Sequence, residues 1–218
     1  APDSQAAEIV QGRGDIICKP IDGSSGQGIC KCTPEDYKDV QALYEQLKAA
    51  GIGIVEDKVI QHEAIAALCP TSVNTIRVAT LLGDKKEGIV YAYIRIGNGK
   101  VMDNVDCGGM AAPINLDTGV ISGVGANKAG ETYEFHPMTG KRIPGTQIPY
   151  WEEVKAMCLK AMHVVPQVRF VAWDVAITPD GPVFIEGNSF PSHAIPQFAA
   201  HFPDGIGILP RFEEFIDL

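Results

Sequence analysis

Long apolar runs are missing from this 218-residue sequence, and no stretch approaches the roughly 20 residues that a transmembrane helix needs. Its start, Ala1-Pro2-Asp3, carries no basic segment followed by an apolar one, as a secretory leader would. Basic residues are outnumbered, 18 Lys and Arg against 27 Asp and Glu, and the net charge of -9 argues against a general nucleic-acid surface. We therefore expect a cytoplasmic protein with no membrane span and no nucleic-acid partner.

Paired Cys-x-x-Cys motifs are also missing from the six cysteines, so we expect reduced structural thiols rather than a zinc site. These residues are Cys18, Cys30, Cys32, Cys69, Cys107 and Cys158. Hydrophobic residues make up 45% of the chain and charged residues 21%, which is typical of one large globular domain or of two tightly joined lobes.

A Gly-rich segment, Gly23-Ser24-Ser25-Gly26-Gln27-Gly28, lies between predicted strands at 15–20 and 29–32. Its free backbone N–H groups can close over phosphates, and Lys19 at the end of the first strand adds a positive charge. No Gly-Lys-Ser/Thr sequence opens a helix after it, so the segment is not a P-loop. A flexible hairpin turn is the alternative.

The middle of the chain predicts helices mixed with antiparallel strands. The predicted helices run from Thr33 to about Gly51, over 151–164 and over 207–218, and the strands cover 58–63, 72–82 and 88–96. Arg77 lies among apolar neighbours, so it is either paired with a carboxylate or presented to an anionic ligand. His136 lies between turns and fits a loop histidine better than a ligand.

Residues 170–188 predict a β-hairpin, because two apolar runs flank Thr178-Pro179-Asp180-Gly181. A left-handed Gly181 would close a three-residue loop with a bulge, which pairs Thr178 with Pro182. Counting outward, the same register pairs Asp174 with Glu186. A two-residue loop would instead place Glu186 on the other face of the hairpin.

Asp174, Glu186 and Asn188 are the candidate metal ligands. In the predicted register they share one face, with the Cβ atoms of opposite residues about 5 Å apart. Two carboxylates at that separation can share a hard cation such as Mg²⁺, and like charges so close raise the pKa of one of them. The alternative is an edge ribbon whose acids point into water.

With these features the chain resembles the ATP-grasp superfamily, and within it the sugar-transfer associated ATP-grasp family, which is linked to cell-surface polysaccharide synthesis. The matching stretches occur in the family's order between about residue 15 and about residue 195. They are Lys-Pro-Ile-Asp-Gly-Ser-Ser-Gly-Gln-Gly, Ser-Val-Asn-Thr-Ile-Arg-Val, His-Pro-Met-Thr-Gly, and Trp-Asp-Val-Ala-Ile-Thr-Pro-Asp-Gly-Pro with Ile-Glu-Gly-Asn.

The resemblance implies ATP and Mg²⁺ as cofactors and gives each candidate residue a role. Arg77 would be the catalytic residue that meets the γ-phosphate or an acyl phosphate, and Asp174, Glu186 and Asn188 would bind Mg²⁺. The residues implied to contact the nucleotide are Lys19, Ser24, Ser25, Gly26, Gln61, His62 and Glu63. In the implied reaction a carboxylate attacks the γ-phosphate, and an amine or other nucleophile then displaces phosphate.

The implied fold is α+β, an ATP-grasp fold of two α+β lobes with the nucleotide between them. We expect a smaller nucleotide-covering lobe at 1–60 and a larger lobe with an antiparallel sheet at 61–218. Relatives usually carry a preceding N-terminal domain, for which the 18 residues before Lys19 leave no room. The chain is thus either a fragment or binds its small-molecule carboxylate and nucleophile with a partner chain. Two other functions stay open, a phosphotransferase acting on a hydroxyl and a non-catalytic nucleotide-binding module.

Overall fold

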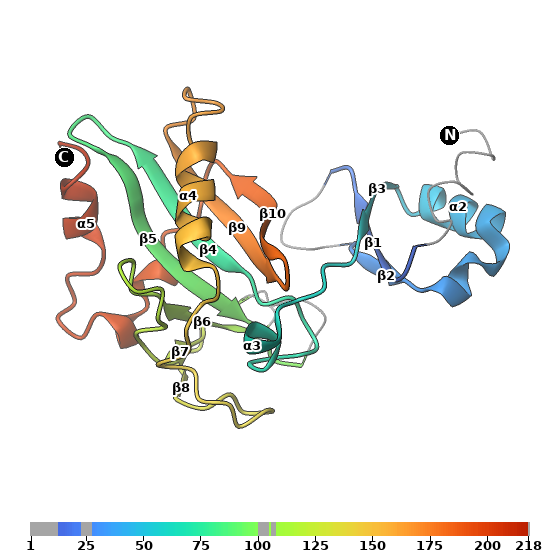
Figure 1. Ribbon diagram of the computed structural model, residues 1–218, viewed down its shortest axis with the longest axis horizontal. Coiled ribbons are helices and arrows are strands. Elements are labelled where there is room, and N and C mark those ends of the chain that lie inside the picture. Colours follow the sequence, from blue (N-terminus) through green and yellow to red (C-terminus); the bar gives the residue numbers. More distant parts are fainter. Residues whose placement is uncertain (1–12, 23–27, 100–104, 106–107, 218) are drawn as a thin grey trace. The chain divides into compact units, whose positions relative to one another are not determined.

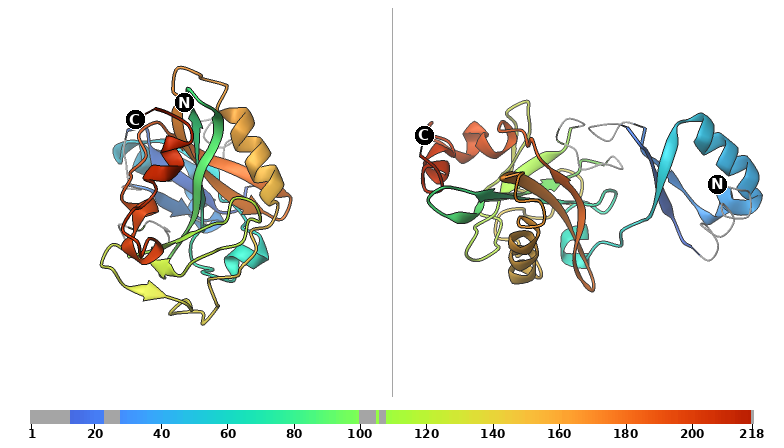
Figure 2. Two further views of the ribbon diagram at one scale, coloured as in Figure 1. Left: turned by 90° about the vertical axis from the view of Figure 1, so that its left-hand side faces the viewer. Right: turned by 90° about the horizontal axis from the view of Figure 1, so that it is seen from above.

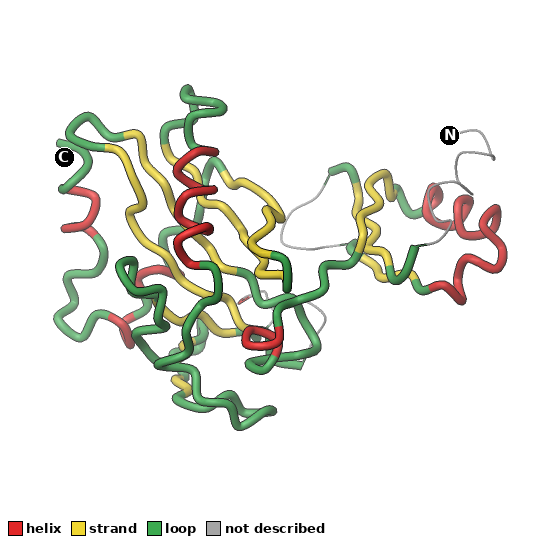
Figure 3. Tube along the Cα trace, viewed as in Figure 1, coloured by secondary structure: helices red, strands yellow, loops and turns green. Residues whose placement is uncertain are grey.

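The computed structural model describes residues 13–22, 28–99, 105 and 108–217, and the chain divides into two compact units, residues 1–59 and 60–218 (Figure 1). Figure 3 separates the helices of each unit from its strands. Within the described ranges, no helix combines the length and the apolarity needed to cross a membrane. That the first unit covers a nucleotide remains a prediction.

The first unit is a three-stranded antiparallel sheet with a helix on one face. Strand β1 (Ile16–Pro20) lies between β2 (Cys30–Cys32) and β3 (Ile52–Asp57). Because side chains alternate along a strand, Ile16 and Cys18 of β1 both enter a small core that Leu43 of the helix completes. Burial raises the pKa of the Cys18 thiol to about 12.

The helix predicted from Thr33 is divided into a 3-10 helix, η1 (Pro34–Asp39), and an α-helix, α2 (Val40–Ala49). The Asp36 carboxylate accepts hydrogen bonds from the Thr33 N–H at 2.7 Å and from its hydroxyl at 2.9 Å, which fixes the first start. Asp39 accepts a hydrogen bond from the Ala42 N–H at 2.9 Å and starts the helix a second time. A second cap therefore interrupts what the apolar spacing predicted as one helix.

The strand predicted at 58–63 is wrong. Strand β3 ends at Asp57, and Glu63 already begins the short helix α3 (Glu63–Ala66). His62 causes the change, since its Nδ1 accepts a hydrogen bond from the Ala64 N–H at 3.2 Å and caps that helix. Its own N–H donates to the Ile177 carbonyl at 2.7 Å.

The second unit is built on a seven-stranded antiparallel sheet in the order β10-β9-β4-β5-β6-β7-β8. Its strands are β4 (Ile76–Leu82), β5 (Glu87–Ile96), β6 (Met110–Pro113), β7 (Gly125–Ala126), β8 (Thr132–Tyr133), β9 (Phe170–Thr178) and β10 (Gly181–Asn188). The other helices with described bounds in this unit are α4 (Trp151–Ala161), η3 (Ile195–Gln197), η4 (Ala199–His201) and α5 (Leu209–Glu213). The predicted antiparallel sheet is confirmed.

Each face of this sheet has its own core, and Figure 2 shows α4 and α5 on opposite sides of the strands. Trp151, Val154 and Cys158 of α4 pack on Ile76 and other alternate residues of the strands. The C-terminal segment packs on the other face through residues such as Phe215. Both cores lie entirely within residues 60–218, which places the fold's main source of stability in this unit.

His136 lies in a loop, as predicted, and is buried there, with 1% of its surface exposed. Its Nε2 lies 2.8 Å from the Gly97 carbonyl oxygen, and its Nδ1 accepts a hydrogen bond from the Met138 N–H at 3.4 Å. Both ring nitrogens are thereby used in holding loops together. The main partner lies 39 residues away, so nothing nearby in the sequence indicated it.

Candidate active site

The hairpin of β9 and β10 pairs Asp174 with Glu186 as predicted, but it does so by a different route. Thr178 pairs with Gly181 and not with Pro182, so the loop has two residues, and the predicted three-residue loop is wrong. A bulge at Ile185 adds the residue that the shorter loop lacks. The register therefore confirms the pairing of the two acids.

Four paired residues form a row across four neighbouring strands of the sheet. Tyr93 of β5 pairs with Arg77 of β4, and Arg77 also pairs with Asp174 of β9. Asp174 in turn pairs with Glu186 of β10. Directly paired side chains project from the same face, so this charged row lies on the face opposite α4.

Asp174 is fully buried and is bound by two arginines. Arg77 donates from Nε to Oδ1 and from Nη2 to Oδ2, both at 2.6 Å, and Arg95 donates from Nη2 to Oδ2 at 2.9 Å. Burial works to raise the pKa of Asp174, but the hydrogen bonds from Arg77 and the charges of both arginines outweigh burial, and the pKa is lowered. The raised pKa expected for one of the two paired acids is therefore not found at Asp174.

Arg77 takes the first of its two predicted alternatives, since it is paired with a carboxylate. Its side chain is 9% exposed. Burial disfavours the charged guanidinium, yet Asp174 more than compensates and raises the pKa of Arg77 above its ordinary value. The bidentate contact holds the guanidinium plane in one orientation on the sheet face.

Arg95 is a member of this site that the sequence analysis missed. Its Nε and Nη2 donate to the Thr75 hydroxyl at 2.9 and 2.6 Å, in addition to the contact with Asp174. Arg95 lies between Ile94 and Ile96 in a buried strand. An arginine among apolar residues was the signal that identified Arg77, and the same signal was present here.

Glu186 and Asn188 supply the more accessible oxygen atoms. Glu186 is exposed, and the Asn188 side-chain amino group lies 3.4 Å from the Glu186 Oε1 and 3.4 Å from the Ala172 carbonyl oxygen. The amide oxygen of Asn188 is then the atom that can serve as a ligand. With Asp174 these residues form an all-oxygen donor set, which fits Mg²⁺. The arginines use three of the roughly four lone-pair directions of Asp174, so Glu186 is the more available acid.

The residues implied to contact a nucleotide are distributed along the chain. Lys19 of β1 lies in the first unit, where it forms an ion pair with Glu56. Gln61 uses its side chain within the second unit, accepting from the Asn74 N–H at 2.6 Å and donating to the Ser72 carbonyl at 3.1 Å. His62 caps α3, and Glu63 is exposed in its first turn.

Three further predicted contacts, Ser24, Ser25 and Gly26, lie outside the described residues. Four of the predicted site residues do lie together on one sheet face, and these are Arg77, Asp174, Glu186 and Asn188.

The model of the sugar-transfer associated ATP-grasp family matches residues 3–215. The chain belongs to this family. The resemblance stated from the sequence is thereby confirmed, and so is the α+β ATP-grasp fold. No curated protein sequence matches the chain.

Solved structures with this ATP-grasp fold are similar to the chain at low sequence identity. The biotin carboxylase domain of the Hydrogenobacter thermophilus 2-oxoglutarate carboxylase, solved with MgADP, ADP and bicarbonate, has a TM-score of 0.50 and 17% identity, over 90% of this chain and 35% of that one. D-alanyl-alanine synthetase A from Vibrio cholerae has a TM-score of 0.49 and 14% identity, over 98% of this chain and 51% of that one. The chain therefore spans between about a third and a half of the length of these structures.

Beside the charged row of this ATP-grasp chain lies a cavity of about 330 Å³. Tyr91 and Tyr93 contribute to its lining, and each hydroxyl is buried without a hydrogen-bond partner among the described residues. Asn115, Asp117 and Arg211 add polar groups to the lining of the cavity. Burial raises the pKa of both tyrosines, so they remain neutral phenols that can donate a hydrogen bond.

Proposed function

We propose that the chain belongs to an ATP-dependent ligase that activates a carboxylate as an acyl phosphate for attack by an amine or another nucleophile. The observation that carries the proposal is the set of three charged members of the row, Arg77, Asp174 and Glu186, with Arg95 beside them. Two guanidinium groups and two carboxylates on one sheet face suit a reaction that moves a phosphoryl group between oxygen atoms. The pathway we propose is cell-surface polysaccharide synthesis, which the family's description as sugar-transfer associated supports.

Each residue of the row has a separate task in this proposal. Glu186, Asp174 and Asn188 hold Mg²⁺, which together with ATP supplies the charge neutralisation and the phosphoryl group when both are bound. Arg77 faces the oxygen atoms on which negative charge develops, and Asp174 keeps its guanidinium in place. Lys19, Ser24, Ser25, Gly26, Gln61, His62 and Glu63 remain the proposed nucleotide contacts. Because its side chain is engaged with Asn74, Gln61 would make its contact through the main chain.

The cavity next to the row is the site we propose for the acceptor substrate. The buried hydroxyls of Tyr91 and Tyr93, which contribute to its lining, have no hydrogen-bond partner among the described residues. Burying a hydroxyl without a partner costs free energy, and a ligand that supplies hydrogen-bond acceptors would offset this cost. A small carboxylate with further oxygen atoms matches these donors and the charge of Arg211.

Hydroxylamine trapping tests the proposal without knowledge of the natural nucleophile. The protein is incubated with ATP, Mg²⁺, a panel of small carboxylic acids and hydroxylamine, and hydroxamate and ADP are measured. A carboxylate that is activated as an acyl phosphate yields both products together. Glu186→Gln is the control, since a neutral amide is a poorer metal ligand.

The products also separate the proposed function from the two alternatives. ADP with a phosphorylated acceptor and no hydroxamate would identify a phosphotransferase. Nucleotide binding without the formation of ADP from any acid would identify a binding module.

A further inference from the structure

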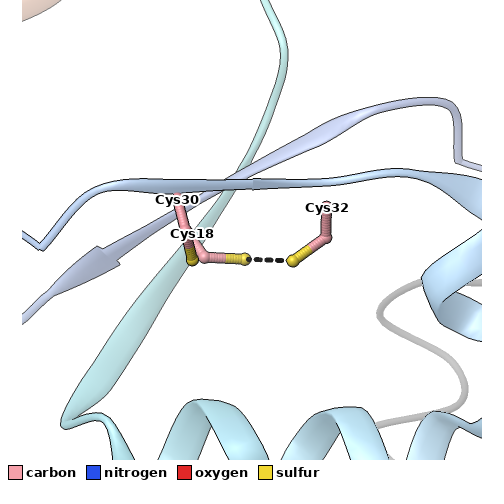
Figure 4. A group of neighbouring side chains, drawn as sticks. All are labelled: Cys18, Cys30 and Cys32. Carbon is pink, nitrogen blue, oxygen red and sulfur yellow. Dashed lines mark hydrogen bonds between the residues drawn. The ribbon is translucent and has the colours of Figure 1, made fainter.

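Three cysteines of the first unit, Cys18, Cys30 and Cys32, place their sulfur atoms within 4.8 Å of one another (Figure 4). The strand register explains why they meet. Cys18 of β1 pairs directly with Cys30 of β2, and Cys32 follows two residues later on β2. Residues two apart on a strand share a face, so all three side chains project from the face that packs on α2.

We propose that this cluster binds a thiophilic d¹⁰ cation, Zn²⁺ or Cu⁺, through three thiolates. Thiolate sulfur is the donor that these ions prefer in proteins. Zn–S bonds of about 2.3 Å around a tetrahedral ion separate two sulfur atoms by about 3.8 Å. The Cys18 and Cys32 sulfur atoms are 3.8 Å apart, whereas a disulfide would need about 2 Å. The spacing suits a shared ion.

Burial gives this site one closed side and one open side. Cys18 is fully buried and Cys32 is 6% exposed, whereas Cys30 is exposed. A cation can therefore enter at Cys30, and water can complete its coordination there. Because the three ligands come from two neighbouring strands, a bound ion would tie β1 to β2 and stabilise the first unit.

The cation site lies on the face of the small sheet opposite to Lys19, one of the residues proposed to contact nucleotide. Cys18 and Lys19 are consecutive in β1, so their side chains project from opposite faces of the small sheet. Lys19 pairs with Glu56 on its own face. The site can therefore be tested by metal binding alone, with no need for ATP turnover.

A cadmium titration of the reduced, full chain tests the site, because Cd²⁺ bound to thiolates gives an ultraviolet charge-transfer band. We expect saturation at one ion per chain. Cys30→Ser alters an exposed side chain and leaves the core intact. We expect it to weaken Cd²⁺ binding by more than about 100-fold, because losing a ligand weakens binding more than losing a residue that only orients a ligand. Cys32→Ser should give the same result from a second position.

Cys158→Ala is the matched control, since Cys158 is a buried cysteine of α4 in the second unit. It should bind Cd²⁺ as the unaltered chain does. Zn²⁺ should raise the melting temperature of the unaltered chain and of Cys158→Ala, but not that of Cys30→Ser. Equal Cd²⁺ affinity in the unaltered chain and in both serine variants would overturn the proposal, as would a charge-transfer band lost only in Cys158→Ala.

Discussion

Asp174 carries a negative charge although its side chain is fully buried. The hydrogen bonds from Arg77 and Arg95 offset the free-energy cost of burying this charge. Removing the charge of one partner in a buried ion pair costs about 3–5 kcal/mol, because the remaining charge stays buried. We therefore expect Asp174→Asn to lower the free energy of unfolding by about that amount. Urea unfolding followed by circular dichroism measures it.

Glu186→Gln is the control for this measurement, since the side chain is exposed and its unfolding free energy should change by no more than about 0.5 kcal/mol. The two acids are paired in the sheet but differ in burial, so we expect their variants to differ in stability. Equal stability of both variants would contradict the importance given to the Arg77 contact.

The lowered pKa of Asp174 makes a prediction about acid unfolding. A carboxyl group with a lowered pKa in the folded state stabilises the fold above its unfolded value of about 3.9, and loses that contribution as the pH falls through the folded pKa. The stability difference between the unaltered chain and Asp174→Asn should therefore stay constant from about pH 7 to about pH 5 and shrink below about pH 4. Urea melts across this range test it, and a difference that shrank near neutral pH would count against the assignment.

Lys19 and Arg77 should affect different steps of turnover. Lys19→Ala removes a charge proposed to contact bound ATP and should mainly raise the KM for ATP. Arg77→Lys keeps the buried charge but loses the bidentate geometry, so it should mainly lower kcat. Steady-state kinetics of the trapping reaction measure both constants. If both variants raised KM alike and left kcat unchanged, the two proposed roles would be wrong.

At the scale of elements, long and strongly patterned segments could be predicted from the sequence. Strands β5, β9 and β10 and helix α4 were expected where they occur, because their apolar spacing extends over many residues. Strands β7 and β8 have two residues each and no pattern to detect, so they were missed. The late start of β4 was also hidden, since Asn74 instead donates to the Ile65 and Cys69 carbonyls.

The charged row shows the same division between near and distant partners. The pairing of Asp174 with Glu186 was predicted by counting residues within one hairpin, and it is found because the bulge at Ile185 compensates for the shorter loop. The pairing of Arg77 with Asp174 joins strands 97 residues apart, and only the sheet order determines it. For the three cysteines the sequence predicted reduced structural thiols, and the register of β1 and β2 is what brings Cys18 to Cys30 and Cys32.

At the scale of the whole molecule, both large cores belong to the second unit, and the core of the first unit has four buried residues among those described. Small units bury too little apolar surface to be stable alone. We expect residues 60–218, expressed without the first unit, to unfold cooperatively in urea. Residues 1–59 alone should lack a cooperative transition.

Near-ultraviolet circular dichroism and urea melts of both fragments check this prediction. A fragment of residues 60–218 without a near-ultraviolet signal would show that its cores need the first unit. A cooperative transition in residues 1–59 without added metal would show that four buried residues are sufficient there.

Because of the bulge at Ile185, the site depends on whether an odd or an even number of residues is deleted from β10. Between the loop and Glu186, β10 has one more residue than regular pairing with β9 requires, and the bulge absorbs it. Deleting Ile185 alone should give an unbulged ladder in which Glu186 still faces Asp174, so the variant should retain Mg²⁺-dependent turnover. Deleting Phe184 as well should set Glu186 opposite Val175, on the other face, and abolish turnover. Deleting one residue is thus tolerated, whereas deleting two is not. Assays of the two variants distinguish this alternation between sheet faces from a loss of turnover that depends on strand length alone.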